Sequence, residues 1–240
     1  MRAMQYVMAL ACAAGMASAQ TTVVDFESGN EGWDGPQGIG GATFIDPTGG
    51  NGGSAGLHTQ FNNFGIEFAT STNSDFLGNY TTSDEITISF DLKIDQIGFS
   101  GLNIARPFML ELRNNDLGDP GYPWASAYLL FDWYTDSADD GFITLSTTFN
   151  PNDTDVPAGW GGNGAFDPVT FAPKLPDGVT FADVLSGVDE IAISTFLPDY
   201  FFTFDDYDVT VDNISITRVP APASAFALLG MGIVGTRRRR

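Results

Sequence analysis

Two aromatic segments in glycine- and proline-rich stretches are the best candidates for ligand binding. Tyr122, Pro123 and Trp124 follow Gly121, and Trp160 lies between two glycines. Exposed aromatic rings stack on sugar rings, with polar groups arranged around them. Tyr122, Trp124 and Trp160 are therefore the candidate carbohydrate-binding residues. The alternative is that either tryptophan folds back over the edge of the domain and anchors its loop.

The sequence offers little for catalysis. His58 is the single histidine, and no Gly-x-Ser-x-Gly turn accompanies it. Zinc sites use several His or Cys ligands, whereas the one cysteine, Cys12, lies near the N-terminus. Paired carboxylates hydrolyse glycosides, but among 30 acidic residues a suitable pair is expected by chance. We expect no catalytic residues, and a glycoside-active enzyme on the same fold is the alternative.

The charge balance excludes one class of partner. Residues 20–218 hold all 30 acidic residues and five basic ones, a formal net charge of −25. Nucleic-acid binding needs clustered Lys and Arg, which this region lacks. An excess of carboxylates attracts cations such as Ca²⁺. The acidic run from Asp136 to Gly141 lacks the ligand spacing of an EF-hand, so a hairpin turn is expected there.

Alternating apolar residues predict the elements that position these side chains. In residues 86–94, five apolar residues alternate with four polar ones, the pattern of a strand with one buried face. Shorter alternations occur in residues 64–68, 108–113, 127–134 and 143–149, separated by turns rich in Gly and Asp. Only residues 180–186 look helical. The fold class is therefore all-β, one antiparallel β-sandwich of the jelly-roll kind over residues 20–218.

The pattern also makes predictions about single residues. Trp33 and Trp133 are expected in the core, and residues 205–208 in a solvated loop. Val209 and Val211 share one parity, whereas Ile214 and Ile216 share the other. This break predicts a β-bulge near residues 212–213.

The N-terminus reads as a secretory signal peptide covering residues 1–19. Arg2 precedes an apolar run, and Ala17, Ser18 and Ala19 form a small-residue cleavage site that leaves Gln20 first. The run is too short to span a bilayer, which takes about 20 residues. We therefore expect the export machinery to be a partner.

The C-terminus has an equally ordered pattern. An apolar stretch, residues 225–234, follows Pro220, Pro222 and Ser224 and precedes four arginines, Arg237, Arg238, Arg239 and Arg240. Such a segment inserts into a membrane with its basic end in the cytoplasm. Residues 219–240 resemble the PEP-CTERM sorting signal, with Ala221 in place of the usual glutamate. The resemblance implies a hydrophobic sorting helix, recognition by an exosortase-type enzyme, cleavage between Pro220 and Ser224, and delivery to the cell surface, outer envelope or extracellular matrix.

Two segments of the middle region carry further resemblances. Residues 25–33 and 211–214 together resemble jelly-roll domains of the galactose-binding-like class. That resemblance implies neighbouring first and last strands and a structural Ca²⁺ held by Asp25, Glu27 and Asp212. Residues 75–79 and 86–92 resemble the laminin B domain.

These observations together predict an exported, surface- or matrix-associated protein without catalytic activity. Polysaccharide binding or adhesion is its expected role. The alternatives are a glycoside-active enzyme and a purely structural envelope protein.

Overall fold

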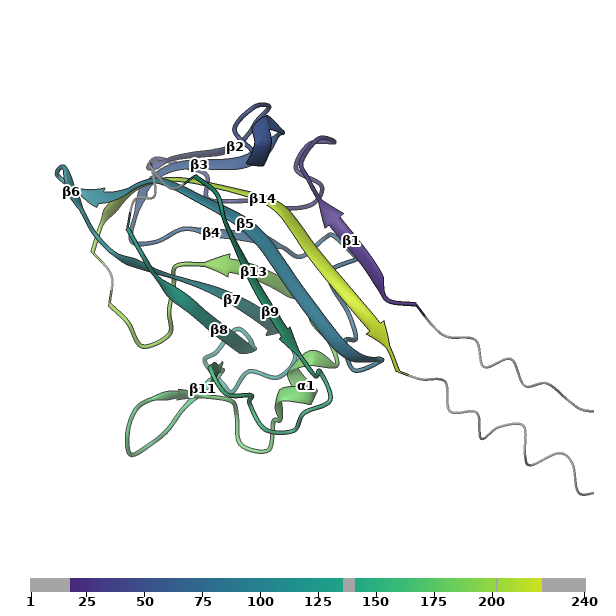
Figure 1. Ribbon diagram of the computed structural model, residues 1–240. Helices are drawn as coiled ribbons and strands as arrows, with labels where there is room; N and C mark the ends of the chain where they lie inside the picture. Colours follow the sequence, from purple (N-terminus) through teal and green to yellow (C-terminus); the bar gives the residue numbers. More distant parts are fainter. Residues whose placement is uncertain (1–17, 136–140, 202, 222–240) are drawn as a thin grey trace, which may run out of the picture.

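The computed structural model describes residues 18–135, 141–201 and 203–221 (Figure 1). Most of the predicted signal peptide therefore lies outside the described residues. The same holds for Pro222, Ser224, the four terminal arginines and most of the acidic run from Asp136 to Gly141. Gln20 is the first residue of the first strand, Ala19 is exposed beside it, and Pro220 is the last residue of the last strand.

Within the described residues, two antiparallel sheets make up the domain. The seven-stranded sheet has the order β2 (Gly41–Asp46), β3 (Gly56–Asn63), β14 (Asp205–Pro220), β5 (Ser83–Phe99) and β6 (Leu102–Asn103), with β1 (Gln20–Val24) on β14 and β9 (Ile143–Phe149) on β5. The five-stranded sheet has the order β10 (Trp160–Asn163), β8 (Ala125–Tyr134), β7 (Arg106–Asn114), β13 (Glu190–Ser194) and β4 (Glu67–Thr70). A small pair, β11 (Ala165–Phe166) and β12 (Pro173–Lys174), lies beside them. This arrangement is a β-sandwich.

The inner faces of the two sheets form the core. The apolar row of β5, from Ile86 to Ile94, is at most 1% exposed, and the inner row of β7 is fully buried. Trp33 is fully buried as well and packs edge-on against Phe76. Burying such aromatic and branched side chains is the main favourable term in folding. The alternation in residues 86–94 and 108–113 therefore predicted the core faces of these two strands correctly.

The first and last strands are neighbours, as the jelly-roll resemblance implied. β1 runs antiparallel to the end of β14, with Gln20 opposite Arg218 (Figure 1). The predicted bulge is confirmed, because the register of β14 against β5 shifts between Asp212 and Ser215. Asn213 has a φ of 49° there. The extra residue returns Ile214 to the core face.

The prediction that Trp133 is a core residue is wrong. The register between β7 and β8 shifts between Phe108 and Met109, so β8 carries one extra residue there. Beyond this bulge the parity of β8 is reversed. Tyr134 packs edge-on against Phe108, whereas Trp133 is 37% exposed. A bulge that interrupts no hydrophobic run leaves little trace in the sequence.

The predicted loop at residues 205–208 is in fact the start of β14. Asp205 is fully buried and forms an ion pair with Arg106, and Tyr207 is buried beside it. Four polar or aromatic residues resemble a solvated turn in sequence. The predicted loop would have left the carboxylate of Asp205 in contact with water. In the structure, buried Arg106 from another strand compensates its charge instead.

Short helical elements complete the fold. α1 (Phe181–Leu185) confirms the predicted helix, and Thr180 caps it by accepting a hydrogen bond from the backbone N–H of Asp183. η1 (Asn51–Gly53) lies in the loop between β2 and β3. Among the described residues, no helix combines the length and apolarity that crossing a membrane requires.

Candidate functional site

The outward-facing side of the five-stranded sheet, called here the outer face, holds the most distinctive group of polar and aromatic side chains. Leu110 and Leu112 of β7 face the core, so the intervening Met109, Glu111 and Arg113 face outward. Residues paired across antiparallel strands share a face. Leu130, Tyr128 and Ser126 of β8 are paired with these three residues and therefore also lie on the outer face.

A buried arginine lies at the centre of this face. Arg113 is 5% exposed, and its guanidinium donates to Glu111 at 2.5 and 2.9 Å and to Glu67 at 2.5 and 3.0 Å. It also pairs with Glu190, and Ser126 donates to Glu111 at 2.6 Å. The sheet brings these groups together, since β13 lies between β7 and β4 and carries Glu190 opposite Arg113.

The electrostatics of the group follow from this geometry. Burial alone would lower the pKa of Arg113, but its hydrogen bond to Glu67 and the charges of Glu111 and Glu67 raise the pKa above its usual value. Three carboxylates surround one guanidinium, which leaves an excess of negative charge. The Glu111 side chain is 4% exposed, whereas those of Glu67 and Glu190 are 26% and 27% exposed. The excess charge is therefore presented to solvent by Glu67 and Glu190.

Trp124 completes this group. The guanidinium carbon of Arg113 lies 4.3 Å from the centroid of the Trp124 ring, a cation–π contact. The indole is half-buried, and it precedes β8 directly. Three carboxylates hold Arg113, so the guanidinium that the Trp124 ring contacts has a defined position. Of the three residues predicted to bind carbohydrate, Trp124 is the one on the outer face.

Tyr128 is a second aromatic residue on this face, and sequence reasoning did not select it. It is half-buried, and its ring lies over Gly161 of β10, where a Cβ would clash with the phenol. Burial and the charges of Glu111 and Asp199 raise the pKa of Tyr128. The alternation of β8 placed Tyr128 opposite the inward row, but that parity alone does not separate a binding residue from an ordinary surface residue.

The outer face continues to the far end of β8. Trp133 is paired with Pro107, which shares the outward parity of Met109. Its ring contacts Tyr200 edge-on, with centroids 4.9 Å apart. Leu130, which is partly exposed, lies between Tyr128 and this second aromatic pair along β8.

Trp160 is placed differently. Its ring packs against Phe149 and Phe181, with centroids 5.0 and 5.5 Å apart, and it is packed against the hydrophobic core. This is the geometry of a residue that anchors an edge strand.

Tyr122 lies apart from both tryptophans. It lines a cavity of about 300 Å³ together with Phe166, Lys174 and Asp177. Trp124 and Trp160 are absent from the lining of this cavity. The three predicted residues therefore do not form one platform.

The predicted calcium ligands make different contacts in the structure. β1 ends at Val24 and Phe26 has a φ of 59°, so Asp25 and Glu27 lie in a turn and do not share a strand face as predicted. The carboxylate of Asp25 is exposed and accepts the backbone N–H of Glu27 at 3.2 Å. Glu27 accepts the backbone N–H of Ala55 at 2.9 Å.

Asp212 is fully buried on the outer side of the seven-stranded sheet. It accepts hydrogen bonds from the backbone of Asn51 at 2.8 Å, from Ser54 at 2.9 Å and from the backbone of Asn213 at 2.7 Å. Burial raises the pKa of Asp212, these hydrogen bonds oppose the shift, and the charge of neighbouring Asp91 adds to it.

These surroundings do not fit a calcium ion. Ca²⁺ binds six to eight oxygen atoms, whereas Asp25, Glu27 and Asp212 each accept hydrogen bonds from separate groups of the protein. Among the described residues, no group of three or more His, Cys, Asp or Glu side chains is arranged to hold a metal.

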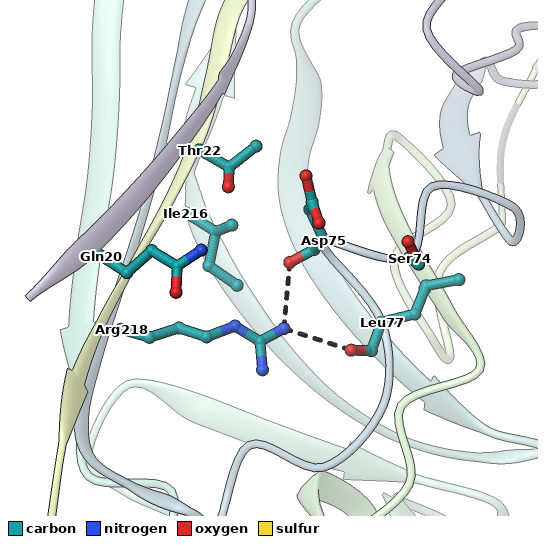
Figure 2. Close-up of a pocket in the computed structure, with 7 residues that line it drawn as sticks. All are labelled: Gln20, Thr22, Ser74, Asp75, Leu77, Ile216 and Arg218. Carbon is teal, nitrogen blue, oxygen red and sulfur yellow. Dashed lines mark hydrogen bonds between the residues drawn. The ribbon is translucent and has the colours of Figure 1, made fainter.

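A polar cavity of about 220 Å³ lies where the two ends of the domain meet, between β1, β14 and the turn before β5 (Figure 2). Arg218 donates from one nitrogen to the carbonyls of Asp75 and Leu77, at 3.0 and 3.1 Å. Its guanidinium also lies 4.6 Å from the centroid of the Tyr80 ring. These contacts fasten the end of β14 to the turn, so a structural role explains this arginine.

His58 is held between two carboxylates. Its Nε2 lies 2.6 Å from Asp208, its Nδ1 lies 3.8 Å from Asp46, and its ring stacks on Phe44. No serine or threonine is bonded to either ring nitrogen in these contacts, so they do not form a hydrolase triad.

The sequence matches no protein-family model and no curated protein. Solved structures with a similar course of the chain include an exo-β-agarase, at 15% identity and a TM-score of 0.47 over 84% of this chain and 26% of that one. They also include a carbohydrate-binding module specific for non-crystalline cellulose, at 17% identity and a TM-score of 0.37 over 79% and 89% of the two chains. A carbohydrate esterase from a Shiga toxin-encoding bacteriophage has 12% identity and a TM-score of 0.41 over 82% and 100%. The chain thus spans about a quarter of the agarase. At this level of similarity, what the outer face binds must be inferred from its own side chains.

Proposed function

We propose that this chain is an exported, non-catalytic carbohydrate-binding protein, and that its binding site is the outer face of the five-stranded sheet around Trp124 and Tyr128. The supporting observation is the bracing of Trp124 by Arg113, which is itself held by Glu111, Glu67 and Glu190. An aromatic ring fixed in advance stacks on a sugar with little loss of conformational entropy.

The groups around the two rings suit sugar hydroxyls. Glu67 and Glu190 are partly exposed, and carboxylate oxygens accept several hydrogen bonds each. The Tyr128 hydroxyl both donates and accepts. Flat aromatic surface with polar groups beside it is the usual composition of a carbohydrate site.

The absence of catalysis and the export route are parts of the same proposal. The carboxylates nearest to Trp124 are hydrogen-bonded to the guanidinium of Arg113, and we assign them the role of holding that guanidinium rather than a catalytic one. The signal peptide and the PEP-CTERM-like tail would carry the domain to the surface or matrix, where polysaccharides are available. Incubation of the full chain with polysaccharides should release no new reducing ends.

Substitution of the braced tryptophan tests the proposal. A polysaccharide that slows the migration of the parent chain in affinity electrophoresis is chosen first. Trp124→Ala in the full chain should weaken binding to this polysaccharide at least tenfold, because the stacking surface is lost. Tyr128→Ala should also weaken binding to the polysaccharide. Tyr122→Ala is the matched control, since Tyr122 lines a separate cavity, and it should bind like the parent chain.

Unfolding midpoints of the variants should be compared, so that loss of binding is separated from loss of the fold. Retention of full affinity by both Trp124→Ala and Tyr128→Ala would place the site elsewhere. Absence of binding to every polysaccharide tested would reject the function itself.

A further inference from the structure

We infer that the polysaccharide is uncharged or carries amino groups, that it lies extended along β8, and that acidic polysaccharides are excluded. This inference rests on the proposed function and deepens it. The observations behind it are the charges of the outer face and the positions of its aromatic residues.

The charge of the outer face is negative wherever it is accessible. Glu67 and Glu190 are partly exposed, and Asp199 lies near enough to Tyr128 to raise the pKa of its phenol. Within residues 18–135, 141–201 and 203–221, Arg113 is the basic residue of this face, and its guanidinium is already bound to three carboxylates.

The other basic residues of the described part are engaged elsewhere. Lys93 pairs with Asp95, Arg106 with Asp205, Lys174 with Asp177, and Arg218 with backbone carbonyls of a turn.

A uronate or sulfate group stacked near Trp124 would therefore meet carboxylates and no accessible cation. Like charges within a few ångströms repel, and at a partly buried surface solvent and salt screen that repulsion incompletely. A hydroxyl group can donate to the same carboxylates, and an ammonium group can pair with them. The face thus discriminates by rejecting anionic ligands as well as by attracting the others.

The aromatic residues indicate an extended ligand. Trp124 and Trp133 stand at opposite ends of β8, nine positions apart, and because one of these is the bulged residue the separation is about 26 Å at ~3.3 Å per residue. Tyr128 and Leu130 lie between them on the same face. A single sugar reaches only one of the two ends, whereas a chain of several sugars contacts both.

Oligosaccharides matched in length and differing in charge test the inference. The probes are hexamers of cellulose, chitosan and polygalacturonate, with affinities for the full chain measured by calorimetry at pH 5.5 and low salt. We expect the neutral and amino hexamers to bind, and the acidic hexamer to bind at least tenfold more weakly than the neutral one.

Neutralising the exposed carboxylates should reduce the difference in affinity between the acidic hexamer and the other two. In the double variant Glu67→Gln/Glu190→Gln, affinity for the amino hexamer should fall severalfold and affinity for the acidic hexamer should rise. Glu85→Gln is the matched control, because Glu85 is exposed on β5 of the other sheet, and it should leave all affinities unchanged. Trp133→Ala should weaken binding of the hexamer more than binding of a trimer.

The outcomes separate the inference from the proposed function. If the acidic hexamer binds as tightly as the others and Trp124→Ala abolishes that binding, the inference is overturned and the proposed function stands. If Trp133→Ala affects hexamer and trimer equally, the extended mode is overturned. If neither the neutral nor the amino hexamer binds while another polysaccharide does in affinity electrophoresis, the inference is overturned and the proposed function stands.

Discussion

The outer faces of the two sheets both carry buried carboxylates, and they compensate them in different ways. On the five-stranded sheet, Glu111 is bound by the guanidinium of Arg113. On the seven-stranded sheet, Asp91 and Asp212 are opposite each other on β5 and β14, and uncharged groups of the described residues donate hydrogen bonds to them. Those donors are backbone and side-chain groups of Asn51, Ser54, Thr144 and Asn213.

Under the proposed function, this difference separates the binding face from a structural face. Around Asp212, the hydrogen bonds run from loop to strand and fasten the turn of residues 51–54 onto the sheet. Around Arg113, one cation attracts more carboxylates than it neutralises, and the surplus reaches solvent beside two aromatic rings. A self-satisfied polar cluster has no capacity left for a ligand, whereas a cluster with surplus acceptors has.

Removing the cation should have the largest effect on stability. Arg113→Met leaves Glu111 buried without its guanidinium and beside two other carboxylates, which should lower the free energy of unfolding by about 3–5 kcal/mol. Urea unfolding of the full chain followed by tryptophan fluorescence measures the change.

The control for this variant is Lys93→Met. The Lys93 and Asp95 side chains are 30% and 33% exposed, so losing that pair should cost at most about 1 kcal/mol. Equal losses in the two variants would show that Arg113 is not a special compensating charge.

Asp212→Ala should have a smaller effect, about 1–3 kcal/mol, because it leaves the backbone N–H of Asn51 without its acceptor and the hydroxyl of Ser54 with only the Asn51 carbonyl. Removing the repulsion of Asp91 offsets part of the loss. Thermal or urea unfolding at neutral pH measures the difference.

The dependence on pH has a defined sign. Burial raises the pKa of Asp212 in the folded state above 3.8, so protonation favours the folded state. The stability that the raised pKa of Asp212 contributes to the folded state is complete below pH 3.8. It is lost as the pH rises through the folded-state pKa. The stability advantage of the parent chain over Asp212→Ala should therefore grow as the pH falls from 7 towards 4. A stability difference between the parent chain and Asp212→Ala that shrinks as the pH falls would contradict a raised pKa of Asp212.

Several features of the two sheets could be predicted from the sequence. Alternation in residues 86–94 and 108–113 gave the inner and outer rows, and the parity change after Val211 gave the bulge that returns Ile214 to the core. The capped helix after Thr180 was equally readable. These features depend on residues that are neighbours in the chain, for which local propensity and period are informative.

The rest depends on which strands become neighbours. Nothing in the spacing of Glu67, Arg113 and Glu190 shows that β13 lies between β7 and β4 and so gathers them. Trp133 was misassigned because a bulge in β8 reversed its parity without any apolar signal. Trp124 and Trp160 have similar glycine-rich surroundings in sequence, and only packing against Arg113 or against Phe149 distinguishes their roles.

The smallest expected effect is that of calcium. If the seven-stranded face is self-satisfied, adding Ca²⁺ or a chelator should leave the midpoint of thermal unfolding of the full chain unchanged, because an ion stabilises only a folded state that binds it. Asp212→Ala supplies the control, since any calcium effect through Asp212 must disappear in it. A midpoint that rises with Ca²⁺ in the parent chain, but not in Asp212→Ala, would mean that the donors now on Asp212 give way to the ion. The two outer faces would then differ in which ligand they take, and the contrast between a structural and a binding face would no longer hold.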